Sequence, residues 1–184
     1  ELIVKAAKKL GLASRLHVDE FVDGGGLQLA TELGAISGDH VGHSSETARQ
    51  SASDSGVMQT FLPGTPYILG HNLETPLRQC IENNWPFSLA TDFNPNCRSL
   101  SMPFVGSLAT HRLGLSPIEA LVAVTRNPAT TLLNSTPGQQ VTGSIREGGP
   151  ADLLILDSQY IDAWCQMPGD NPIYRTIKSG DIVN

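Results

Sequence analysis

The sequence lacks the features that mark secreted, membrane-spanning and nucleic-acid-binding proteins. Its only cysteines, Cys80, Cys97 and Cys165, stand far apart and form no Cys-x-x-Cys pair, which excludes a disulfide framework and a zinc knuckle and favours the reducing cytoplasm. No apolar run approaches the roughly 20 residues that span a bilayer. With a net charge of −6 and no dense block of Lys and Arg, we expect neither nucleic acid nor membrane as a partner.

What the sequence does contain is an alternation of strand-like and helix-like segments. Apolar segments of strand length, bounded by Gly, Pro or polar residues, occupy residues 14–21, 35–41, 57–64 and 85–93. Segments with helical spacing occupy residues 1–12, 23–34, 44–56 and 75–84. Strands that alternate with helices are typical of a parallel sheet with crossover helices. The sequence therefore predicts an α/β fold with four parallel strands.

The pattern changes after residue 93. Two helices are expected at 101–114 and 116–133, the second with Ser116 and Glu119 in the spacing of a capping box. Segments 143–157 and 172–183 have the pattern of short antiparallel strands. We therefore divide the chain into residues 1–140, which carry the strand and helix alternation, and residues 141–184, a small β-sandwich segment.

Polar residues follow the predicted parallel strands, where a (β/α) barrel places its active site. His17, His40 and Asp92 stand at three strand ends, and imidazole and carboxylate groups are the ligands of zinc or iron in hydrolases. Glu20 is expected to reach a bound water or a substrate N–H, the alternative being a solvated loop glutamate. The remaining histidines are expected to be structural or solvent-exposed: His43, His71 and His111.

The order and spacing of several motifs resemble the imidazolonepropionase family of the amidohydrolase superfamily. They are HVDEF (17–21), GDH (38–40), FLPGTPY (61–67) and ATDFNPN (90–96), followed by SPIEALVAVTRNPATTL, GSIREGGPADLLILD and NPIYRTIKSGDIV. The resemblance implies the C-terminal half of a (β/α)8 TIM barrel with part of a small β domain. It also implies one divalent or trivalent metal ion, zinc or iron.

The resemblance assigns roles to individual residues. His17 and Asp92 would bind the metal, and Asp92 would also take a proton from the attacking water. Glu20 would contact the substrate ring and help to move its protons, while His40 would form a hydrogen bond beside the attacking water. The chain has NPNC where many relatives have NPGT or NPGS. The residues of this segment that would line the substrate are Asn94, Asn96 and Cys97.

The implied reaction is hydrolysis of the cyclic amide 4-imidazolone-5-propanoate to N-formimidoyl-L-glutamate in histidine degradation. Two alternatives stay open: another cyclic amidohydrolase or ring deaminase of the superfamily, and a non-catalytic remnant. Whether the parent enzyme is a homodimer is also open. The family's His-x-His pair is absent and the chain starts at Glu1, so we expect a fragment of a longer enzyme that by itself is inactive and binds zinc weakly.

Packing adds a further expectation. Val18, Ile36, Phe61 and Leu89 are expected to point into the barrel interior, where a half barrel would leave them without an opposite wall. An isolated half barrel would then associate with itself or with its missing half.

Overall fold

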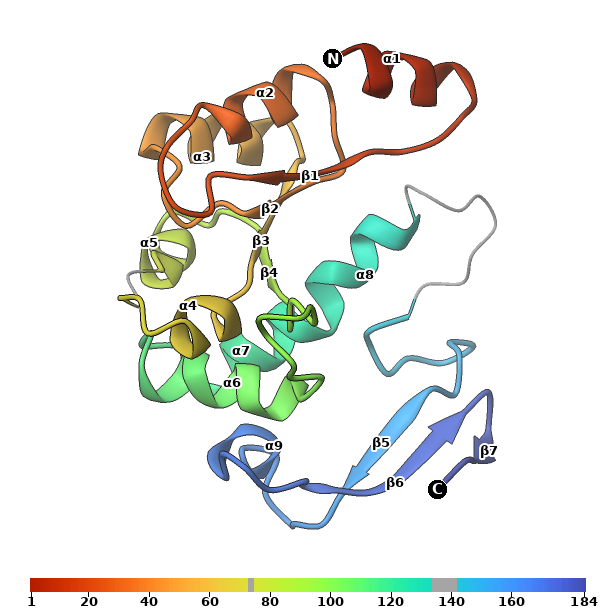
Figure 1. The fold of residues 1–184 in the computed structure, drawn as a ribbon. Helices are drawn as coiled ribbons and strands as arrows, with labels where there is room; N and C mark the ends of the chain where they lie inside the picture. The colour runs from red at the N-terminus through yellow and green to blue at the C-terminus, as the bar shows by residue number, and fades with distance from the viewer. Residues whose placement is uncertain (73–74, 134–141) are drawn as a thin grey trace.

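The computed structural model describes residues 1–72, 75–133 and 142–184 and contains a four-stranded parallel sheet (Figure 1). Its strands are β1 (Arg15–Val18), β2 (Ser37–His40), β3 (Met58–Phe61) and β4 (Phe87–Leu89), paired in that order. All three pairings are parallel. The predicted α/β fold with four parallel strands is confirmed, and the carboxyl ends of all four strands meet at one edge.

Helices connect these strands. Ser45 caps α3 by accepting a hydrogen bond from the Ala48 N–H at 3.3 Å. A left-handed glycine follows two helix ends, Gly34 after α2 and Gly56 after α3, as the sequence indicates. The short helix α4 was not expected, because five residues carry no apolar repeat. The helices up to β4 are α1 (Leu2–Lys9), α2 (Gly26–Glu32), α3 (Glu46–Asp54), α4 (Gly64–Ile68) and α5 (Leu77–Glu82).

The sheet presents its apolar side chains to the helices. Phe61 and Leu89 are buried in a core that also contains helix residues such as Leu27, Ala52 and Cys80. Val18 packs against the same core. The expectation that Val18, Phe61 and Leu89 fill the barrel interior was therefore wrong, while Ile36, which was expected there too, is half-buried and lies outside this core. Side chains alternate between the two faces of a strand, so a strand that turns its polar residues inward must turn the residues between them toward the helices.

The opposite face of the sheet carries a polar row. His17, Asp39, Thr60 and Ser88 are register partners on neighbouring strands. The Thr60 and Ser88 hydroxyls are hydrogen-bonded at 2.9 Å. Arg15 lies two residues before His17 and therefore shares this face. Arg15 donates to the Ser37 hydroxyl, and that hydroxyl donates to Asp39. The interior face of this half barrel is thus lined by hydrogen-bonded polar side chains rather than by apolar ones.

The segment expected to be one helix at 116–133 forms two helices, α7 (Pro117–Val124) and α8 (Arg126–Leu133). They follow α6 (Met102–His111). The capping box of Ser116 and Glu119 is present. The chain breaks at Thr125, where φ is −123° and ψ is −78°. Pro128 explains the break, because it has no N–H for the Val124 carbonyl and is tolerated only in the first turn of a new helix.

The last part of the chain forms a separate antiparallel sheet of β5 (Leu153–Leu156), β6 (Ile173–Lys178) and β7 (Asp181–Ile182). Helix α9 (Ala163–Gln166) packs on α6, where the Ser107 hydroxyl donates to the Cys165 carbonyl at 2.6 Å. The predicted boundary at 140/141 falls within residues 134–141, outside the described residues. The division into two parts, with a β-sandwich at 141–184, stays a prediction.

The longest helix in the described ranges has 10 residues. None of the helices there is long and apolar enough to cross a membrane.

Candidate metal and catalytic site

Three strand ends deliver the side chains of the candidate site. His17 lies on β1, His40 is the last residue of β2, and Asp92 follows β4. His40 and Asp92 have left-handed backbones, with φ of 80° and 55°, and so does Asp19, with φ of 52°. Such conformations cost on the order of 1–3 kcal/mol each and persist only where surrounding contacts hold them. The strained backbone positions therefore coincide with residues whose side chains form or support the candidate site.

The side chains form an alternating line of imidazole and carboxylate groups. His17 Nε2 lies 2.9 Å from Glu20 Oε2, and His40 Nδ1 lies 3.9 Å from Glu20 Oε1. On its other side, His40 Nε2 lies 3.8 Å from Asp92 Oδ2. The centroids of the two imidazole rings are 4.3 Å apart. The sequence-predicted residues His17, Glu20, His40 and Asp92 therefore converge on one place.

This group has the chemistry of a metal site. His17, Glu20 and His40 each offer one ligand atom, and these atoms lie within 4.8 Å of one another. Imidazole nitrogen and carboxylate oxygen suit zinc or iron. The resemblance pairs His17 with Asp92 instead, and Asp92 lies beside His40 at the edge of the same group. The donor set fits one ion.

The surroundings of His40 favour its neutral form. Its side chain is 8% exposed. Burial lowers the pKa of His40, while the charges of Glu20 and Asp92 oppose this effect, and the net direction is downward. A neutral imidazole is the form that binds metals and accepts hydrogen bonds.

A threonine that sequence reasoning missed holds Asp92. The Thr65 hydroxyl, at the start of α4, donates to Asp92 Oδ2. The Asn94 side chain donates to the backbone carbonyl of Asp92 at 2.8 Å. Thr65 belongs to the motif FLPGTPY, so the signal was present, although nothing in the spacing connected it to Asp92.

Asp19 anchors the loop that carries Glu20. Its carboxylate accepts hydrogen bonds from the backbone N–H groups of Gly24, Gly26 and Leu27 and from the Ser44 hydroxyl. Burial raises the pKa of Asp19, but the four donors outweigh this effect and leave the pKa below its usual value. Asp19 thus fastens the end of β1 to α2 and to the loop after β2.

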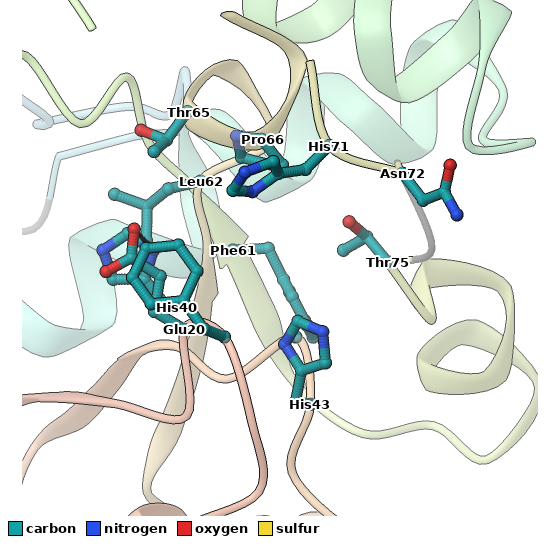
Figure 2. A pocket seen from close by; sticks show the side chains of 12 residues that line it. Glu20, His40, His43, Phe61, Leu62, Thr65, Pro66, His71, Asn72 and Thr75 are labelled. Atoms are coloured by element: carbon teal, nitrogen blue, oxygen red, sulfur yellow. Dashed lines mark ion pairs between the residues drawn. The ribbon is translucent and has the colours of Figure 1, made fainter. Parts of the chain in front are cut away.

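A pocket of about 420 Å³ opens beside Glu20 and His40. Figure 2 shows these two side chains on one side of the pocket and Asn72 and Thr75 on the opposite side. His43 and His71 are exposed, as the sequence predicts. They also line the pocket and therefore face the candidate site. Sequence reasoning missed them because their loops carry no ligand spacing.

The predicted substrate-binding residues after Asp92 shape their own loop. The Asn94 side-chain oxygen accepts hydrogen bonds from the N–H groups of Asn96 and Cys97. Cys97 is fully buried, and its thiol donates to the Thr91 carbonyl. Among the described residues that line the pocket, none comes from this loop. A substrate contact of Asn94, Asn96 or Cys97 stays a prediction.

Comparison with known proteins places these motifs in context. A family model described as "Amidohydrolase family" matches residues 4–183. An imidazolonepropionase from Halobacterium salinarum is 35% identical over 98% of this chain and 43% of its own length. One from Haloarcula marismortui is 36% identical over 99% of this chain and 42% of its own length. The chain spans less than half the length of these relatives and matches their C-terminal part.

A solved structure shares the fold. A mutant atrazine chlorohydrolase from Arthrobacter aurescens, complexed with zinc and atraton, superposes with a TM-score of 0.78 at 17% identity. The match covers 98% of this chain and 46% of that chain. This likeness bears on the fold alone, and it agrees with the predicted half of a (β/α)8 barrel.

Proposed function

The chain belongs to the amidohydrolase family, and from this premise we propose that it contributes to hydrolysis of 4-imidazolone-5-propanoate to N-formimidoyl-L-glutamate in histidine degradation. The similarity to imidazolonepropionases over nearly the whole chain supports this substrate. The observation that carries the proposal is the line of His17, Glu20, His40 and Asp92 at the ends of parallel strands. The three cysteines are buried and unpaired, which supports action in the cytoplasm.

One zinc or iron ion would complete the site. We propose that His17 and Asp92 hold it, with His40 beside them and Glu20 left to the substrate. When bound, such an ion acts as a Lewis acid and lowers the pKa of water. The residue types support this choice, because an imidazole nitrogen and a carboxylate oxygen are ligands that zinc and iron accept.

The side chains then divide the proton movements. The oxygen of water adds to the ring carbonyl carbon, the carbon–nitrogen bond breaks, and the leaving nitrogen gains a proton. Asp92 accepts the proton of the attacking water. His40, neutral and placed between Glu20 and Asp92, orients this water by hydrogen bonding. The proton that Asp92 has accepted passes to the leaving ring nitrogen, and Glu20, which lies next to the pocket, helps to move it there.

The same donor set would also serve a ring deaminase, which replaces an amine by a hydroxyl group. The two reactions differ in their products, because ring hydrolysis of the imidazolone releases no ammonia. A non-catalytic remnant would give neither product.

The test is a product assay with 4-imidazolone-5-propanoate on the purified complete protein that contains this chain. We expect metal-dependent formation of N-formimidoyl-L-glutamate, identified by mass spectrometry, without ammonia. Ammonia release from a heterocyclic amine, in the absence of imidazolone hydrolysis, would replace the proposal with the deaminase. If the metal-bound protein catalyses neither imidazolone hydrolysis nor ring deamination, the remaining interpretation is a non-catalytic remnant.

A further inference from the structure

Arg49 is a buried cation next to the candidate site. It lies in the first turn of α3 and is 2% exposed. Its guanidinium donates to Gln59 Oε1 at 3.2 Å and to the backbone carbonyls of Val41 and Gly42. The guanidinium carbon lies 5.3 Å from the centroid of the Phe61 ring. Across residues 1–72, 75–133 and 142–184, no carboxylate lies within ion-pair distance of it.

This placement is costly. Removing a cation from water without a carboxylate within ion-pair distance carries a large desolvation penalty, and the first turn of a helix disfavours positive charge. Burial accordingly lowers the pKa of Arg49. A hydrophobic side chain would fill the same space without this cost. The compensation must come from the hydrogen bonds, and a guanidinium is the side chain whose planar fork reaches several acceptors at once.

The acceptors identify what Arg49 holds. Val41 and Gly42 directly follow His40, and both His40 and Val41 have left-handed backbones, with φ of 80° and 46°. A β-branched residue such as Val41 rarely adopts this conformation. On the other side of the turn, the Val41 N–H donates to the Val18 carbonyl at 3.0 Å. The His43 N–H donates to the Asp19 carbonyl at 3.3 Å. The strained turn is therefore held between β1 and Arg49.

We infer that Arg49 is a positioning residue, which fixes the turn at residues 40–42 and thereby keeps the His40 imidazole between Glu20 and Asp92. The catalytic consequence rests on the proposed function, whereas the effect on the turn does not. Lysine cannot replace Arg49 fully, because a single ammonium cannot reach both carbonyls and Gln59 in the planar arrangement of the fork.

The test compares Arg49→Lys and Arg49→Met with Val57→Ala in the complete protein. Val57 is 2% exposed in the same core and precedes β3, so its truncation reports general destabilisation. Amide hydrogen exchange of residues 41–44 is measured at matched global stability, together with kcat and KM. For Arg49→Lys we expect about tenfold faster exchange in this segment. We also expect a kcat lower by about 10- to 100-fold, as for a misplaced catalytic group, at nearly unchanged KM.

The control separates positioning from stability. Val57→Ala should keep the exchange of residues 41–44 and kcat near the wild-type values. If Arg49→Met fails to fold, Arg49→Lys decides. Unchanged exchange at residues 41–44 in Arg49→Lys would overturn the inference, and so would faster exchange with an unchanged kcat. If the wild-type protein does not hydrolyse the imidazolone, the proposed function fails, and the exchange measurement still decides whether Arg49 holds the turn.

Discussion

In the proposed function, the chemistry of the site depends most on Glu20. It lies 2.9 Å from the His17 imidazole and 3.9 Å from that of His40, and it lines the pocket. Glu20 directly follows Asp19, whose carboxylate fastens this loop to α2. Both oxygens of Glu20 face imidazoles, which favours a role in the site over the alternative of a solvated loop glutamate.

Replacing Glu20 by Gln should separate chemistry from fold. The amide keeps the shape of the side chain but removes its charge and its ability to accept a proton. In the complete protein we expect kcat to fall by about 10²–10⁴, the range for a lost acid–base group, with metal content unchanged. Steady-state kinetics and metal analysis measure both quantities. Glu32→Gln, at an exposed position on α2, is the matched control. A wild-type kcat in Glu20→Gln with metal bound would contradict the prediction and would leave Glu20 as a solvated loop glutamate.

Asp19 is expected to be a stability residue. In Asp19→Asn, one of the two side-chain acceptors becomes an NH2 group, which faces the Leu27 N–H or the Gly24 and Gly26 N–H groups. The buried N–H that loses its acceptor should lower the free energy of unfolding by about 1–3 kcal/mol. Urea denaturation measures this loss. Asp23→Asn is the control, because among the described residues the Asp23 side chain accepts a single hydrogen bond, from the Gly25 N–H. Equal stability of the two variants would contradict the prediction.

At the scale of elements, the start of α7 is defined by reciprocal contacts. The Ser116 hydroxyl accepts the Glu119 N–H, and the Glu119 carboxylate accepts the Ser116 N–H at 2.7 Å. The same carboxylate accepts two hydrogen bonds from Arg78, which lies on α5. The capping box therefore also ties α7 to a helix that precedes β4. Hydrogen bonding from the Ser116 backbone is the main reason that the pKa of Glu119 lies below its usual value.

Glu119→Gln should show the pH dependence of this cap. Because the pKa of Glu119 is depressed in the folded protein, its charge stabilises the fold above its unfolded pKa, and this contribution is lost as the pH falls through the folded value. At pH 7 we expect a loss of about 0.5–1.5 kcal/mol in the variant. The difference from wild type should shrink below about pH 4. Denaturation curves across pH measure it, with Glu32→Gln as reference. A difference that grows toward low pH would refute the sign.

At the scale of the molecule, apolar side chains stand outside the core. Helix α1 buries none of its residues: Leu2 and Ile3 are 83% and 84% exposed, and Leu10 at its C-terminal cap is 77% exposed. Figure 1 shows α1 above the sheet and β1 at one edge of it. An edge strand offers unpaired N–H and C=O groups. The residues that face the barrel interior add less exposed apolar surface than expected, because that face of the sheet is polar.

We therefore predict that these 184 residues, expressed by themselves, associate with one another. Burial of apolar surface is worth about 25 cal/mol per Å², which favours covering the α1 side chains. Sedimentation should reveal species larger than a monomer. Leu2→Gln, Ile3→Gln and Leu10→Gln together should shift the distribution toward monomer. A compact, cooperatively unfolding monomer of the unaltered chain would contradict the prediction.

Local rules explain why the sequence by itself determined most of the elements. Helix caps and strand alternation act over a few residues, so the capping box at Ser116 and the helix end at Gly34 could be predicted from neighbouring positions. The placement of His17, His40 and Asp92 at strand ends followed from the same alternation, because parallel strands share one carboxyl edge. The break at Thr125 was also within reach of a local rule, since Pro128 stood in the middle of the expected helix.

Only the tertiary structure decided which groups meet. Glu20 lies between two imidazoles because Asp19 folds its loop onto α2, and Asp92 is held by Thr65, 27 positions earlier in the chain. Which face of the sheet is polar, and the burial of Arg49 beneath the His40 turn, depend on the same packing. These contacts join residues from different loops whose backbones are strained, and no pattern within one segment specifies how such loops approach each other.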